Sequence, residues 1–208
     1  RLKIFCGRAI YYKIGMTLSC RVKPCHGKVD FYTIQMYSIR MGLLLTASSR
    51  LISQKLESAR ERGVHVIHGP RGLSRWALEA LCPVLETTRT LYWVDAANRF
   101  DAQALSKRAQ ELGLNPRTVL SHIQLARTFN AFQLVALLSG KLPRLSPGPV
   151  ILADPLAPFY DEDLPLEDAR HAFTRLLLGL ADVPGPVLAL VVDRSAPSSR
   201  SDFAPRFL

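Results

Sequence analysis

The chain has 208 residues, which suits one domain of ordinary size with a tail, and its 48% hydrophobic content is ample for a core. No run approaches the roughly 18 uninterrupted apolar residues of a membrane span, so we expect no membrane partner. The formal net charge of +10 suggests an anionic partner, but residues 1–40 carry +7 of it and the remainder is nearly balanced.

Residues 1–40 differ from the rest of the chain in composition. They hold eight Lys or Arg residues, one acid and three of the four cysteines. Cys20, Cys25 and His26 lack a second ligand pair at zinc-finger spacing, so we expect reduced thiols and a cytoplasmic protein. The segment has no secretory signal; it is an organelle transit segment or, as we favour, a stretch upstream of a real start at Met41. We therefore expect residues 1–40 to be a basic segment outside the core domain, which spans 41–208.

From residue 43 onward, helical and strand patterns alternate. Stripes of apolar side chains predict helices over 43–62, 73–85, 101–112, 130–138 and 166–180. Short apolar or β-branched runs predict strands over 64–67, 90–95, 119–125, 149–153 and 187–192. Gly63 and Gly113 are expected to end helices, and Asn130 to begin one. Cys82 is expected in the core. Residues 195–202 are typical of a loop, and 203–208 of an element that continues, so we expect a C-terminal truncation.

This alternation predicts an α/β fold with a mostly parallel central sheet and helices on both faces. The strands are continuous apolar runs, as expected for strands that are buried on both sides. In such sheets, ligands bind at the carboxyl ends of the strands. The candidate site residues are therefore those that follow the strands, at 68–76, 95–100, 154–163 and 193–194.

The first of these stretches has the layout of a phosphate-binding loop, in which G-x-x-x-x-G-K-[ST] follows a strand and opens a helix. The residues of this candidate nucleotide-binding loop are Gly69, Pro70, Arg71, Gly72, Leu73, Ser74, Arg75 and Trp76. Only the first glycine matches the signature. A helix N-terminus still attracts phosphate through its N–H groups, and Arg71 and Arg75 add positive charge. An ordinary strand-to-helix turn with solvated arginines is the alternative.

Further segments follow in an order that resembles the ATPase core of the RecA/RadA recombinase family, over about two-thirds of the chain. They are residues 92–100 (YWVDAANRF), 125–130 (LARTFN), 150–154 (VILAD) and 176–182 (LLLGLAD). They resemble, in turn, the family's second core strand, its AR-x-FN segment, its Walker B strand and its LL-x-LAD helix. The resemblance implies a three-layer RecA-like P-loop NTPase fold, with ATP and Mg²⁺ as candidate cofactors and Asp154 as the Walker B-like acid.

Several residues depart from the family pattern at the positions that perform the chemistry. Arg75 stands where the family has its phosphate-binding Lys, and a planar guanidinium is not equivalent to an ammonium group. Trp76 offers no oxygen to Mg²⁺, and Ser74 replaces a glycine beside the phosphate. The family's water-activating Glu falls at Ala97, so no catalytic residue is assigned. The loss of a general base and of a metal ligand predicts weak or no ATP hydrolysis.

Other polar residues have a structural interpretation beside the functional one. Asp95 and Asp154 organise Mg²⁺ or cap a turn at a strand end. His65 and His68 lie three residues apart, and we expect them in packing or at the surface rather than as a metal pair.

The leading hypothesis is a degenerate RecA/RadA-like core that assists DNA recombination or repair through partners, either other RecA-like subunits or repair proteins. Direct DNA contact is expected to be weak, because the acidic stretch 161–168 repels phosphate. One alternative is a divergent but active DNA-dependent ATPase, with Arg75 as the phosphate cation and Asp95 as a holder of Mg²⁺. Another is a regulatory interaction module on the same fold, for example in cell-division control, without nucleic-acid binding.

Overall fold

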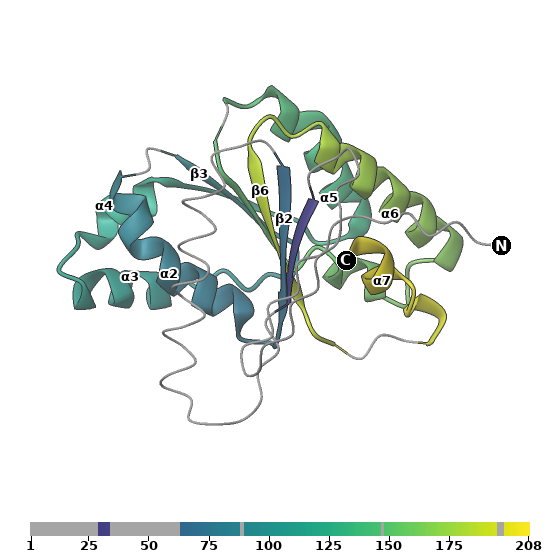
Figure 1. Cartoon of the computed structure of the whole chain (residues 1–208), viewed down its shortest axis with the longest axis horizontal. Helices are drawn as coiled ribbons and strands as arrows, with labels where there is room; N and C mark the ends of the chain where they lie inside the picture. The colour runs from purple at the N-terminus through teal and green to yellow at the C-terminus, as the bar shows by residue number, and fades with distance from the viewer. Residues whose placement is uncertain (1–28, 34–62, 88–89, 147, 195–197) are drawn as a thin grey trace.

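One parallel sheet of six strands organises the protein (Figure 1). The computed structural model describes residues 29–33, 63–87, 90–146, 148–194 and 198–208. The predicted helix over 43–62 and the three residues Cys20, Cys25 and His26 lie outside these ranges. The strand order across the sheet is β1-β2-β6-β5-β3-β4. The strands are β1 (Val29–Thr33), β2 (Gly63–Gly69), β3 (Leu91–Asp95), β4 (Ile123–Arg127), β5 (Val150–Ala153) and β6 (Pro186–Val192).

Helices cover both faces of the sheet, which confirms the α/β prediction. Figure 1 shows α2, α3 and α4 on one face and α5, α6 and α7 on the other. These helices are α2 (Leu73–Thr87), α3 (Ala102–Glu111), α4 (Pro116–Ser121), α5 (Ala131–Ala136), α6 (Leu166–Ala181) and α7 (Phe203–Phe207). Among the described residues, no helix is long and apolar enough to span a membrane.

The alternation of side chains along the central strands explains the three layers. In β6, Val187, Ala189 and Val191 pack into the cluster that α5, α6 and α7 cover. The intervening Leu188, Leu190 and Val192 pack into the second cluster, beneath α2 and α3. Both faces of β6 are therefore buried, and this is why its sequence is a continuous apolar run rather than an alternating one.

The N-cap residues of α3 and α5 lie at the starts of the helices predicted from 101 and 130. The Asp101 side chain accepts a hydrogen bond from the Ala104 N–H at 2.9 Å, and Asn130 accepts one from the Gln133 N–H at 2.9 Å. Gly113, which follows α3, has a φ of 72°. A glycine adopts this conformation without the steric penalty that a Cβ brings. Cys82 is fully buried on α2, as expected.

The strand predicted over 119–125 is wrong in its first half. Asn115 accepts hydrogen bonds from the N–H groups of Arg117 and Thr118, and Pro116 takes the first helical position, so a short helix, α4, forms instead. Val119 is buried on that helix, and β4 begins only at Ile123. The local cap therefore overrides the apolar pattern that predicts a strand. Past Ala136, α5 continues through a π-helical turn (Leu137–Lys141), so the helical path also exceeds the predicted end at 138.

Two further expectations need correction. Part of the basic segment, Val29–Thr33, pairs in parallel with Val64–His68 as the edge strand β1, so these five residues belong to the sheet rather than outside it. The stretch predicted as a loop over 195–202 contains a short 3₁₀ turn, Ser198–Arg200, which leads into α7. Phe203 and Phe207 of α7 are buried in the core cluster over α6, because the sheet and α6 leave an apolar surface there.

Candidate anion-binding site

The glycine turn is shorter than a phosphate-wrapping loop. β2 ends at Gly69 and α2 begins at Leu73, whose N–H donates to the carbonyl of Pro70 at 3.0 Å. Only residues 70–72 therefore lie between the strand and the helix. The signature positions Ser74, Arg75 and Trp76 consequently fall in the first turn of α2, not in the turn itself.

None of the three side chains at these positions lines the arginine pocket described below. Ser74 is buried, and its hydroxyl has no hydrogen-bond partner. Arg75 is exposed and pairs with Glu79 one helical turn later, at 3.2 Å. The indole of Trp76 packs against Gly72, where an added Cβ would come within 2.9 Å of the ring. Arg75 is thus held along the surface of α2, and Trp76 closes over the turn.

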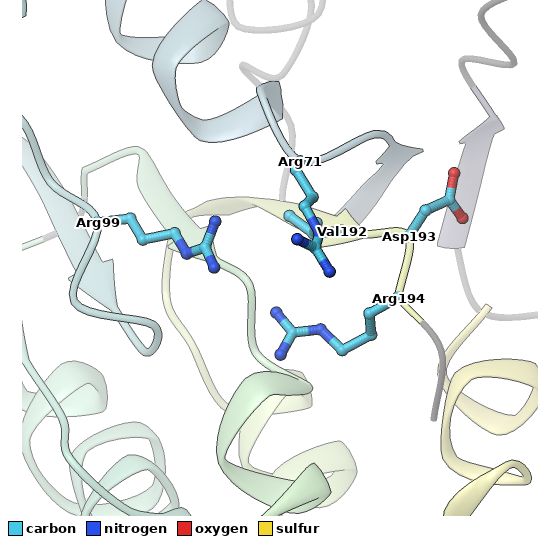
Figure 2. A pocket seen from close by; sticks show the side chains of 5 residues that line it. All are labelled: Arg71, Arg99, Val192, Asp193 and Arg194. Atoms are coloured by element: carbon cyan, nitrogen blue, oxygen red, sulfur yellow. The ribbon is translucent and has the colours of Figure 1, made fainter. Parts of the chain in front are cut away.

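Three other arginines meet at the carboxyl edge of the sheet, in a pocket of about 140 Å³ (Figure 2). Arg71 comes from the glycine turn after β2, Arg99 follows β3, and Arg194 follows β6. Val192 and Asp193 complete the lining. Figure 2 shows the three guanidinium groups pointing toward one another, whereas the carboxylate of Asp193 points away from them. Gathered charges of one sign attract a counter-ion, so this pocket favours an anion.

Asp95 holds the turn that presents Arg99. Its carboxylate is fully buried and accepts hydrogen bonds from the backbone N–H groups of Arg99, at 3.0 Å, and Phe100, at 2.9 Å. The Nε of Arg127 lies 3.8 Å from the same carboxylate. Within this turn, Asn98 has a φ of 54°, which Asn tolerates better than most residues. Asp95 therefore caps the turn that follows β3. Of the two roles considered for it, turn cap and Mg²⁺ ligand, these contacts correspond to the turn cap.

Both the backbone and the carboxylate of Asp193 make contacts away from the guanidinium groups of the pocket. Its backbone N–H donates to the carbonyl of Gly69 at 2.7 Å, which joins the end of β6 to the glycine turn. Its carboxylate lies 2.6 Å from the Nε2 of His68. His68 therefore has a polar partner near the surface of the protein.

Asp154 contacts the pocket through Arg194. Its carboxylate is fully buried and forms an ion pair with the Arg194 guanidinium, which also lies over the ring of Tyr160 at 5.6 Å. The backbone of Asp154 has a φ of 53°, an uncommon value for a residue with a side chain. The Oδ1 of Asp154 and the Nε of Arg194 are both buried without a hydrogen-bond partner. The pair is therefore incompletely satisfied, and the terminal nitrogens of Arg194, which face Arg71 and Arg99 in Figure 2, have N–H donors beyond the one that contacts Asp154.

Burial of Asp154 predicts a pH-dependent stability. Desolvation raises the pKa of this carboxyl from 3.8 to about 6, because it outweighs the attraction of Arg194 and Arg99. Between these two pH values the native state binds more protons than the unfolded state. The protonated carboxyl therefore contributes its full stabilisation below about pH 4. This contribution is lost as the pH rises through 6, so the free energy of unfolding falls by an amount on the order of 3 kcal/mol.

Denaturant unfolding between about pH 4 and 7 measures this change. The variant Asp154→Asn cannot ionise, so its free energy of unfolding should depend less steeply on pH than that of the wild type. Equal slopes for the two proteins would show that Asp154 is not the group responsible.

Two of the three pocket arginines were not singled out from the sequence. Arg71 was named for its charge, whereas Arg99 and Arg194 fell only within stretches that follow predicted strands. The signal that would find them is a basic residue within four positions of the end of a parallel strand. Ala97 lies in the same turn as Arg99 and has no proton-accepting group.

The fold and this pocket define a parallel α/β protein with an arginine-lined site at the carboxyl edge of its sheet. No model of a known protein family matches the chain, and no curated protein matches it. A functional proposal for this chain therefore rests on the pocket and on the order of the sequence motifs.

Proposed function

We propose that the chain is a RecA-like core that binds the phosphate groups of a nucleotide, hydrolyses it inefficiently or not at all, and assists DNA recombination or repair through protein partners. One observation carries the phosphate site: Arg71, Arg99 and Arg194 converge beside the glycine turn, at the edge where parallel sheets bind ligands. The recombination role rests on the order of the segments at 69–76, 92–100, 125–130, 150–154 and 176–182.

The lack of efficient hydrolysis follows from the groups around the pocket. Ala97 cannot accept a proton from an attacking water, and Trp76 has no oxygen for a metal ion. The active-ATPase alternative needs Arg75 at the phosphate and Asp95 at the metal. Arg75 pairs with Glu79, however, and Asp95 is committed to two backbone N–H groups. Neither residue supports that alternative.

Exposed apolar side chains near the edge of the sheet support a protein partner. β4 is an edge strand, and Leu125 on it is 41% exposed. Phe129 and Phe132, which follow it, are 71% and 53% exposed. An open strand edge flanked by exposed aromatic groups is a surface that other chains bind readily.

The charges after β5 and β6 argue against a strong DNA contact. The acids of the stretch that follows β5 are exposed and repel phosphate; they are Asp161, Glu162, Asp163, Glu167 and Asp168. After β6, Arg200 is buried and donates to the carbonyl of Phe159 at 2.9 Å, so it is not available to a DNA backbone. This acidic surface also favours a second candidate function, a regulatory interaction module without nucleic acid.

Nucleotide binding and turnover test the proposed function directly. The full chain is expected to bind ATP and ADP, and to turn ATP over at least about a hundredfold more slowly than the roughly 10 s⁻¹ of a median enzyme. Isothermal titration calorimetry measures the binding, and phosphate release measures the turnover. Turnover near that median rate would contradict the proposal, and so would a failure to bind either nucleotide.

A titration with single-stranded DNA at increasing salt separates the two candidate functions. Weak binding that declines with salt supports the recombination role, because backbone contacts release counter-ions. Complete absence of binding at low salt favours the regulatory module.

A further inference from the structure

Resting on the proposed function, we infer that the arginine pocket binds the diphosphate or triphosphate end of its ligand without Mg²⁺. The guanidinium groups of Arg71, Arg99 and Arg194 supply the positive charge that a lysine and a metal ion supply in P-loop ATPases.

The charge around the pocket matches a multiply charged anion. Among the described residues, the side chains of Arg71 and Arg99 form no ion pair, and Arg194 has one, with Asp154. Planar guanidinium groups donate in pairs to phosphate oxygens, so the three arginines can bind one phosphate group or divide their donors between two adjacent ones. Because two of the three charges have no carboxylate partner, an anion with at least two negative charges balances the pocket.

The size of the pocket limits what enters it. A volume of about 140 Å³ is smaller than the roughly 300–1,000 Å³ of sites that enclose a whole small molecule. The pocket therefore takes the phosphate groups and leaves the rest of the ligand outside. Binding should accordingly depend on the number of phosphates and little on the base.

The same residues do not suit Mg²⁺. This ion is held by one or two carboxylates together with the phosphates of its ligand, and it keeps several waters. Two buried carboxylates lie at this edge next to the pocket: Arg194 occupies Asp154, and Asp95 accepts hydrogen bonds from two backbone N–H groups. Asp193 points away from the guanidinium groups and contacts His68. Trp76 offers no oxygen, and three guanidinium groups repel a cation.

Pyrophosphate and ADP, titrated into the full chain with EDTA or with excess Mg²⁺, test this inference. We expect the affinity with EDTA to equal or exceed the affinity with Mg²⁺, since the metal competes with the guanidinium groups for phosphate oxygens. An affinity at least about tenfold higher with Mg²⁺ would overturn the inference while leaving the proposed nucleotide binding intact. No binding under either condition would overturn both. ADP binding without pyrophosphate binding would overturn the assignment of the pocket to phosphate groups.

The variant Asp154→Asn gives a second test. If Asp154 held a metal ion, the variant would bind more weakly in Mg²⁺. If instead Asp154 only competes with the ligand for Arg194, the variant should bind pyrophosphate roughly fivefold more tightly or better, with or without Mg²⁺. Asp182→Asn is the matched control, because Asp182 is exposed at the end of α6 and its loss changes the net charge equally. An equal gain in both variants would indicate a general charge effect and contradict the assignment.

Discussion

The double variant Arg71→Gln with Arg99→Gln should bind pyrophosphate at least about a hundredfold more weakly than the wild type. Each substitution removes a charged donor that faces the pocket, and a hydrogen bond to a charged group contributes about 1.5–3 kcal/mol. Both side chains lie at the surface turns after β2 and β3, so the fold should tolerate the change. Isothermal titration calorimetry with pyrophosphate measures the loss.

Arg75→Gln is the matched control for this variant. Arg75 lies four positions from Arg71 and carries the same charge, but it is paired with Glu79 along the surface of α2. Its loss should change pyrophosphate affinity less than about threefold, since exposed charges are screened by solvent and salt. A loss as large as that of the double variant would mean that the helix start, and not the pocket, binds the anion.

The variant Asp95→Ala should lower the free energy of unfolding by about 3 kcal/mol or more. It leaves the part-buried N–H groups of Arg99 and Phe100 without their acceptor, at a cost of about 1–3 kcal/mol each, and removes the fully buried Asp95 carboxylate. Urea unfolding measures the change. Because the same bonds hold the turn that presents Arg99, pyrophosphate binding should also weaken.

Asp101→Ala offers the comparison for Asp95→Ala. Asp101 also accepts a backbone N–H, that of Ala104, but at the exposed start of α3. Loss of such a cap costs about 1 kcal/mol, because water replaces the lost acceptor. If Asp95→Ala is no more destabilising than Asp101→Ala, Asp95 does not stabilise the turn in the way described.

Local patterns were sufficient for most of the fold. The apolar runs that became β2, β3, β5 and β6 are strands because both of their faces are covered, and that requirement is visible in their composition. The stretch at 119–125 was predicted as a strand, but the cap formed by Asn115 makes its first half helical, and a short apolar pattern does not distinguish the two. The pairing of β1 with β2 could not be predicted, since β1 lies in the basic segment 1–40, which has no clear periodicity and was placed outside the core.

The candidate site was predictable in place but not in detail. The sequence by itself determined that the glycine turn lacks the lysine and hydroxyl of a phosphate-binding loop, and that Ala97 has no basic group. It also determined that any site would lie where the parallel strands end. These conclusions depend only on residue types and on the order of strands and helices.

Only the tertiary structure decided which charges form the pocket. Arg71, Arg99 and Arg194 are far apart in the chain and meet because the carboxyl ends of β2, β3 and β6 share one edge of the sheet. Arg75 is excluded because α2 begins at Leu73, which places the side chain of Arg75 on the helix surface. Asp154 is engaged by Arg194 because β5 lies beside β6. Which residues are neighbours in a sheet depends on the order of its strands and not on their distance in the sequence. Residue types alone therefore could not identify these contacts.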